Sequence, residues 1–218
     1  MSGEAPQMTA KQRRTTTRVF GVEFFLAYVC DLSYNSGMEK SIETKRLVLR
    51  PWREEDAPFM HQWLCRDDIA KACGVHPHAS IDDSLAAIRH AEHTPGYRVV
   101  TLHDGCPVGA VALVEGTERA RAAGTQAELI FWIAAPYRGD GYATEACEAM
   151  LEYGFGEMGF DSASCNIVGM NDRPMKTAVR LGFEYAFVER TRLYDGEVTS
   201  LVYTVMLKES WTYRHRQR

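Results

Sequence analysis

The chain has 218 residues and a formal net charge of −4, with 45% apolar and 25% charged residues. This length suits one domain with its own core, and the charge excludes the strongly basic class of nucleic-acid-binding domains. Six scattered cysteines without a C-x-x-C pair argue against a structural zinc site or a dense disulfide framework. They favour a reducing, cytoplasmic location.

The first 38 residues are interpreted as an N-terminal extension. Their apolar run, residues 19–30, is shorter than the roughly 18 residues that span a bilayer. No small-residue cleavage site follows it, so neither secretion nor a membrane partner is expected. The extension either packs on the domain or, if Met38 is an internal start, is not native. Residues 39–212 are expected to form the domain, and residues 213–218 a basic C-terminal tail.

Regular patterning begins at Thr44. Alternating apolar residues predict a strand over 46–52, and the acidic start of residues 53–70 predicts one helix. A capping-box pattern, Ser80 with Asp83, precedes a second predicted helix.

The middle and end of the chain predict further strands and helices. Strands on either side of Asp104-Gly105 indicate a hairpin, residues 117–126 a loop, and residues 127–134 a central strand that is apolar on both faces. The remaining predictions are a helix from about Gly141 to Gly159, in which Glu145 points away from the apolar face, a strand over 162–170, a helix over 173–182 and a hairpin around Asp195-Gly196. The order predicts an α/β or α+β fold, a mixed sheet flanked by helices.

The stretch "PYRGDGYATEA", residues 136–146, connects the central strand to the long helix. Main-chain N–H groups at a helix start carry partial positive charge and bind phosphate oxygens. Gly139 and Gly141 let the backbone come close to a ligand, Ala143 keeps the first turn small, and Arg138 adds a cation. The P-loop signature is absent, and the dinucleotide fingerprint matches only as far as G-D-G. From spacing alone, a pyrophosphate site and an ordinary turn both remain open.

The same stretch resembles the acetyl-CoA signature R/Q-x-x-G-x-G/A of the GNAT superfamily of N-acetyltransferases, matched by Arg138, Gly141 and Ala143. Three further segments, 42–58, 171–184 and 193–207, resemble the Rim-type branch, the ribosomal-protein N-terminal acetyltransferases. The resemblance covers about residues 42–210. It implies a GNAT-like fold with a mixed, mostly antiparallel sheet of six to seven strands and about four helices, acetyl-CoA as co-substrate, and no metal.

Carried over by position, the resemblance places the pantetheine arm of acetyl-CoA along the central strand and its pyrophosphate on the amides of residues 139–144. Asn171 matches a position that holds the cofactor arm, although a plain helix cap would explain it as well. The implied cofactor-binding residues are Phe131, Trp132, Ile133, Arg138, Gly139, Asp140, Gly141, Tyr142, Ala143, Thr144 and Asn171.

Glu128 is the candidate general base. An attacking amine is largely protonated at neutral pH, and a positioned carboxylate can remove its proton. Glu128 lies on the central strand, upstream of the glycine turn, and matches a family position that keeps a glutamate base. A solvated or salt-bridged strand-end glutamate is the alternative reading.

The general acid is where the sequence departs from the family pattern. Ala178 and Pro174 stand where relatives carry a tyrosine or a serine, and neither can donate a proton. Tyr142, Tyr185 and Tyr194 are substitutes without a spacing argument, so this role stays unassigned.

The resemblance predicts an N-acetyltransferase that moves an acetyl group from acetyl-CoA to a primary amine by direct transfer. The favoured acceptor is a protein N-terminal α-amine. Alternatives are a small-molecule amine (aminoglycoside, polyamine or amino sugar) or a non-catalytic acyl-CoA-binding regulator, and the donor can be acetyl or a longer acyl group. A monomer or homodimer is expected. His76 and His78 lack a third ligand at a recognisable spacing, so no metal is expected there.

Overall fold

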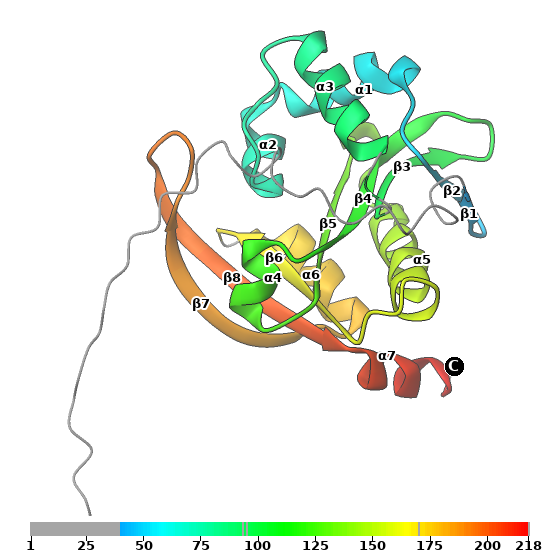
Figure 1. Ribbon diagram of the computed structural model, residues 1–218, viewed down its shortest axis with the longest axis vertical. Helices are drawn as coiled ribbons and strands as arrows, with labels where there is room; N and C mark the ends of the chain where they lie inside the picture. Colours follow the sequence, from blue (N-terminus) through cyan, green and yellow to red (C-terminus); the bar gives the residue numbers. More distant parts are fainter. Residues whose placement is uncertain (1–39, 93, 95, 170, 218) are drawn as a thin grey trace, which may run out of the picture.

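The structure is a computed structural model that describes residues 40–92, 94, 96–169 and 171–217. The predicted extension, residues 1–38, therefore lies outside the described residues. An eight-stranded sheet with the order β1-β2-β3-β4-β5-β6-β8-β7 forms the centre of the fold (Figure 1). Neighbouring strands pair antiparallel except β5 with β6. The strands are β1 (Ile42–Glu43), β2 (Leu47–Arg50), β3 (Tyr97–Leu102), β4 (Pro107–Glu115), β5 (Ala127–Ile133), β6 (Ser162–Val168), β7 (Glu184–Arg192) and β8 (Val198–Leu207).

Helices cover the sheet on both sides. In Figure 1, α1, α2 and α3 lie above the sheet, whereas α5 and α7 lie to its right and below. The α-helices of the described ranges are α1 (Ala57–Leu64), α2 (Asp67–Cys73), α3 (Ile81–Glu92), α4 (Glu118–Ala123), α5 (Tyr142–Gly156), α6 (Asp172–Leu181) and α7 (Lys208–His215). The predicted fold class, a mixed and mostly antiparallel sheet flanked by helices, is confirmed, with more strands and helices than expected.

Two apolar cores lie on opposite faces of the sheet. Successive residues of a strand point to opposite faces, and β5 shows this directly: Phe131 packs against the core that contains α5, and Trp132 against the core of α1, α2 and α3. Strand β3 shows the same alternation: Val100 lies in the core that contains α5, and Val99 in the core of α1, α2 and α3. The prediction of a central strand that is apolar on both faces is therefore confirmed.

Two local predictions were wrong, and one helix was missed. The single helix predicted over 53–70 is two helices, because Arg66 is extended (φ −86°, ψ 125°) and α2 restarts with two aspartates that favour a helix start. The loop predicted over 117–126 contains α4, whose first turn is capped by the Thr117 side chain at 2.9 Å from Ala120 N. Helix α7 was not predicted. It crosses the expected domain end at residue 212, and its Trp211 packs on Phe155.

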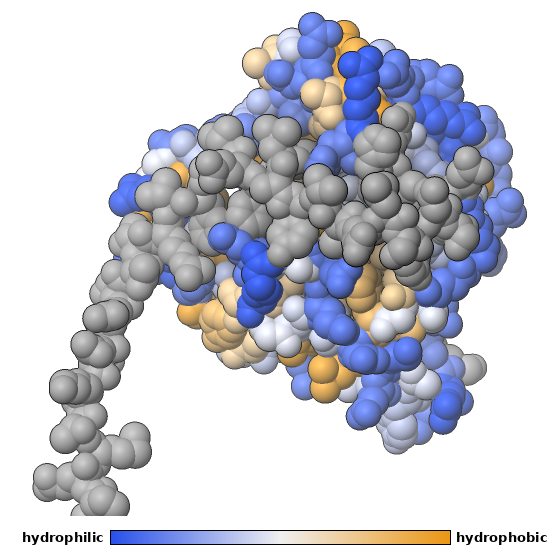
Figure 2. All heavy atoms as spheres, viewed as in Figure 1, coloured by the Kyte–Doolittle hydropathy of each residue, from blue (hydrophilic) through white to orange (hydrophobic). Residues whose placement is uncertain are grey.

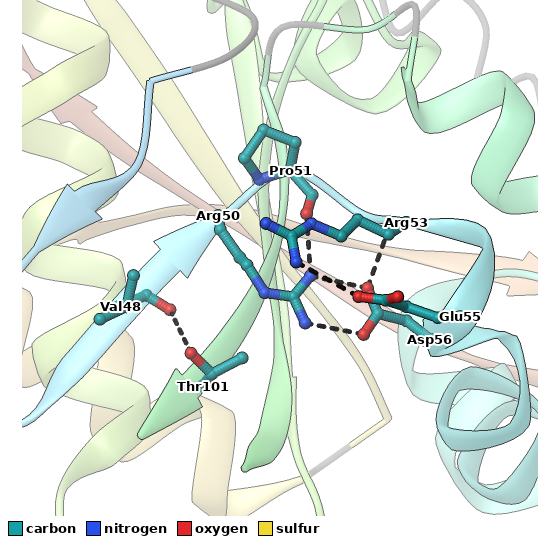
Figure 3. Close-up of polar contacts among 7 residues, drawn as sticks. All are labelled: Val48, Arg50, Pro51, Arg53, Glu55, Asp56 and Thr101. Atoms are coloured by element: carbon teal, nitrogen blue, oxygen red, sulfur yellow. Dashed lines mark hydrogen bonds and ion pairs between the residues drawn. The ribbon is translucent and has the colours of Figure 1, made fainter. Parts of the chain in front are cut away.

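The start of α1 is tied to the end of β2 by an ion pair (Figure 3). Two Arg50 nitrogens lie 2.7 and 2.8 Å from the carboxylate oxygens of Asp56, and Arg53 N donates to the same carboxylate at 2.9 Å. Only 6% of Asp56 is exposed. Salt screens a buried pair less than a surface one, and the three hydrogen bonds orient the start of α1 on the sheet.

The other end of the sheet is the exposed strand β7. Figure 2 shows mostly hydrophilic residues over α1 and α3 and hydrophobic patches lower on this face, toward β7 and β8. Exposed large apolar side chains on these strands are Tyr185, Phe187, Val188, Val198 and Leu207. In the described part of the chain, no helix has the length and apolar character needed to cross a membrane.

Candidate active site

The parallel strands β5 and β6 part like a fork. They pair only at Ala127–Ala163 and Glu128–Ser164, although β5 continues to Ile133 and β6 to Val168. A cavity of about 620 Å³ lies between the two arms of the fork, which we call the fork cavity. Beyond Glu128, the edge of β5 that faces β6 has no strand partner in the ladder. Main-chain polar groups of this kind need a hydrogen-bond partner, so an extended ligand can pair with them.

The glycine turn closes one end of the fork cavity. Gly139 and Gly141 have φ values of 101° and 83°, a left-handed backbone that favours glycine. Gly141 is the N-cap of α5, and residues 141–144 line the cavity. The unpaired N–H groups of the first helical turn therefore border the cavity, as an anion site requires.

Arg46, which sequence reasoning missed, fixes the shape of this turn from outside. Its Nη1 donates to the Asp140 carbonyl at 2.8 Å, its Nε lies 2.7 Å from Glu145 Oε2, and its guanidinium covers the Tyr142 ring at 4.7 Å. Thr44 Oγ1 also donates to Glu145, at 2.7 Å. Glu145, which the helix pattern predicted to point away from the core, instead ties α5 to the start of β2.

Positive charge dominates the lining of the fork cavity. Its cations are Arg119, Arg138, Arg173, Lys176 and Arg180, against two carboxylates, Asp68 and Glu128. Three of the cations recur at three- and four-residue steps on α6, which places them on one helix face. Burial and the neighbouring Arg173 lower the pKa of Arg138, whose Nε donates to the Ile133 carbonyl at 2.7 Å. A ligand with several negative charges fits this lining.

Glu128 lines the same cavity and is buried, with 3% of its surface exposed. Thr117 Oγ1 donates to Oε2 at 2.7 Å, and Arg119 Nη1 lies 3.6 Å from Oε1. The alternative reading of Glu128 as a salt-bridged residue is therefore correct for Oε1, which faces Arg119, whereas Oε2 accepts from Thr117. Its place in the cavity wall keeps the role of base open.

The structure brings together all but one of the predicted cofactor-binding residues. Asp140 is exposed, is not part of the cavity lining and meets Arg46 only through its carbonyl. Asn171 lines the cavity and also caps α6, where its Oδ1 accepts from Arg173 N at 3.3 Å. The helix-cap reading of Asn171 is therefore correct, and it does not compete with a position in the cavity wall.

The candidate proton donors lie in different places. Tyr142 lines the fork cavity, whereas Tyr185 is exposed on β7 and Tyr194 donates to Asp67. Ala178 is fully buried in the core, and Pro174 lines the cavity.

Helix α2, which walls the cavity, is held to the β7–β8 hairpin by a charged group that we call the Lys71 cluster. Lys71 Nζ lies 3.0 Å from Asp67, 2.6 Å from Asp195 and 3.1 Å from Glu197. Tyr194 joins the cluster through Asp67. The hydrogen bond from Lys71 lowers the pKa of Asp195, and that from Tyr194 lowers the pKa of Asp67.

The histidines of the "HPHAS" loop have other partners. His78 Nδ1 lies 2.8 Å from Ser84 Oγ, and the His76 ring packs on Tyr194 at 4.6 Å between centroids. Among the described residues, no group of three or more His, Cys, Asp or Glu side chains could hold a metal ion.

The chain is similar to known proteins in sequence and in fold. The acetyltransferase (GNAT) domain matches residues 46–184. YdaF of Bacillus subtilis, provisionally named a ribosomal N-acetyltransferase, is 32% identical over 118 residues, which is 53% of this chain and 62% of YdaF. This chain therefore matches less than two thirds of that relative.

Solved structures share the fold. An acetyltransferase (GNAT family) from Bacillus anthracis has a TM-score of 0.68 and 19% identity, with 78% of this chain and 99% of that chain covered. Spermidine N-acetyltransferase from Vibrio cholerae, in complex with CoA and spermine, has a TM-score of 0.66 and 19% identity, with the same coverage of both chains.

Proposed function

The chain belongs to the acetyltransferase (GNAT) family, and from that premise we propose that it transfers an acetyl group from acetyl-CoA to a primary amine, preferably a protein N-terminal α-amine. The observation that carries the proposal is the fork cavity. It joins an unpaired strand edge, the N–H groups of a helix start and an excess of cations in one space of about 620 Å³. These groups match the three parts of acetyl-CoA: an extended amide arm, a pyrophosphate and further phosphate.

In the proposed reaction, Glu128 takes the proton of the attacking amine, directly or through a water molecule. The amine nitrogen then bonds to the thioester carbon, and an N–H group of the Phe131–Ile133 segment stabilises the oxyanion. The carbon–sulfur bond breaks as the carbonyl re-forms, and the nitrogen gives its second proton to the released thiolate or to water. The leaving thiolate has an ordinary pKa of about 8.5, so it departs without a strong acid. Of the three candidate tyrosines, Tyr142 is the best placed to act as the general acid, because it lines the cavity.

Direct transfer is favoured over a cysteine-bound intermediate. Burial raises the pKa of the two cavity-lining thiols, Cys73 and Cys165, to about 12. A thiol with such a pKa is protonated at neutral pH and is a poor nucleophile. Both substrates are therefore proposed to be present together.

The lining also favours a singly charged amine over a polyamine. A polycationic acceptor requires several carboxylates, whereas the fork cavity offers Asp68 and the paired Glu128 among five cations. The ribosomal-type assignment of the B. subtilis relative supports the same preference. The absence of the family's tyrosine and serine, at Ala178 and Pro174, keeps a non-catalytic acyl-CoA-binding regulator as the second candidate.

One assay separates these functions. Thiol release from acetyl-CoA is measured alone and with peptides that begin with Ala, Ser or Met, with spermidine and with an aminoglycoside. The proposal expects the largest increase with the peptides. An increase with spermidine or the aminoglycoside only would identify a small-molecule enzyme. Calorimetric binding of acetyl-CoA without turnover on any amine would identify a regulator, and no binding would reject the proposal.

A further inference from the structure

A second cavity, of about 80 Å³, lies beside the fork cavity, on the face of the sheet that α1, α2 and α3 cover. Cys73, Ile130 and Trp132 line both cavities, so these three residues form the wall between them. The other lining side chains are aliphatic or aromatic, and four of them are alanines. We call this space the alanine cavity.

The alanines explain why the space is hollow. Ala87 and Ala91 are four residues apart on α3 and share one helix face, and Ala110 and Ala112 are two apart on β4 and share one strand face. Ala110 and Ala112 lie opposite Trp132 and Ile130 in the β4–β5 register, next to the shared wall. An apolar cavity of this kind stays dry and accepts apolar groups.

We propose that the alanine cavity is the subsite for an aliphatic group of two or three carbons carried by one of the reacting molecules. An engineered apolar cavity of about 150 Å³ binds benzene, so a space of roughly half that volume suits about three carbons. The group is either the part of an acyl chain beyond acetyl or the first side chain of the acceptor. This inference rests on the proposed function.

The position of the shared wall supports the inference. Glu128, the proposed base, precedes Ile130 by two residues and points to the same face of β5, about 6.6 Å away along the strand. The oxyanion position proposed above lies beside Trp132. The reacting carbon and nitrogen would therefore meet next to the wall, and a short aliphatic substituent on either could reach the alanine cavity.

The test has two arms and a filled-cavity variant. In the first arm, calorimetry compares the Kd of acetyl-CoA with that of butyryl-CoA. In the second arm, kcat/KM with acetyl-CoA is compared for peptides that begin with Gly or Val. Each buried carbon is expected to give about fourfold, so the two extra carbons of butyryl give about fifteenfold in Kd and the three carbons of the Val side chain about sixtyfold in kcat/KM. In Ala87→Leu, which fills the cavity, the gain is lost. In Ala86→Leu, which changes the exposed neighbour on the same helix, the gain is kept.

A gain in the donor arm assigns the cavity to the acyl chain, and a gain in the peptide arm assigns it to the acceptor. No gain in either arm, or a gain that Ala87→Leu retains, overturns the inference. If Ala87→Leu does not fold, Ala87→Val adds less volume and serves the same comparison. Normal binding of acetyl-CoA without any gain overturns the cavity assignment alone. No binding of acetyl-CoA rejects the proposed function and this inference with it.

Discussion

The two walls of the fork cavity are built in different ways. One wall consists of β5, the glycine turn and α6, and we call it the donor wall because it is the proposed site of acetyl-CoA; it offers main-chain N–H groups at a helix start together with a row of cations. The other wall consists of α2, and we call it the acceptor wall because we propose that the amine enters beside it; the Lys71 cluster holds this helix to the β7–β8 hairpin. A wall made of backbone binds the shared part of a common donor. A wall made of side chains can change with the acceptor while the donor wall stays the same.

The largest effect is expected at Glu128, where the two walls meet. Glu128→Gln keeps the shape of the side chain but removes the base, so kcat should fall by about 10²- to 10⁴-fold. Single-turnover rates measure this loss, and the Kd of acetyl-CoA should stay the same. Glu115→Gln, an exposed carboxylate on the neighbouring strand, is the matched control. An unchanged rate in Glu128→Gln would remove this residue from the role of base.

A pure donor-wall change comes next. Gly141→Val forces a β-branched residue into a left-handed backbone at the start of α5, which costs about 1–3 kcal/mol of strain and displaces the N–H groups. We expect acetyl-CoA binding to weaken at least about tenfold, or 1.4 kcal/mol, by calorimetry. Gly105→Val imposes similar strain (φ 88°) in the β3–β4 hairpin and should leave binding intact. Equal losses in the two variants would mean that strain alone is being measured.

The cations of the donor wall should contribute smaller, separable amounts. Replacing Arg173, Lys176 or Arg180 with Gln should weaken binding of acetyl-CoA about two- to fivefold for each charge, from 0.5–1 kcal/mol per exposed pair. Binding should also lose part of its dependence on salt, because screening acts on these charges. The control is Arg190→Gln, on the exposed strand β7. A salt dependence that the α6 variants leave unchanged would argue against phosphate contacts there.

The smallest effect is expected in the acceptor wall. Asp67 and Asp195 have lowered pKa values in the folded chain, so their ion pairs stabilise the fold above their ordinary pKa of about 3.9. That stability is lost as the pH falls from about 4 through the lowered values. The Lys71→Met variant should have a lower free energy of unfolding at neutral pH, and that free energy should fall less steeply as the pH decreases. Acid unfolding followed by circular dichroism measures both. Acetyl-CoA binding should not change. Identical acid-unfolding curves would show that the Lys71 cluster adds no stability.

The sequence predicts the two walls unequally for a physical reason. The donor wall depends on local backbone geometry, and Gly139 and Gly141 predict that geometry directly. The Lys71 cluster depends on contacts between residues up to 127 positions apart, and no local pattern encodes such a contact. Glu145 shows the same limit within one helix: its spacing predicts an outward position, yet it binds Arg46 in the distant turn before β2. Helix α4 was missed because six Ala- and Arg-rich residues carry no periodic apolar face.

The short ladder between β5 and β6 has a mechanical consequence. The sheet consists of two halves, β1–β5 and β6–β8, and the strand ladder between them has only two residue pairs. An extended thioester lying in the fork would join the two halves of the sheet, because it would form hydrogen bonds with the main chain of one half and pack against the other. Without ligand, β5 and β6 should therefore open locally, and the amide hydrogens of β6 should exchange with solvent faster than those of β3. Saturation with acetyl-CoA should slow the exchange in β6.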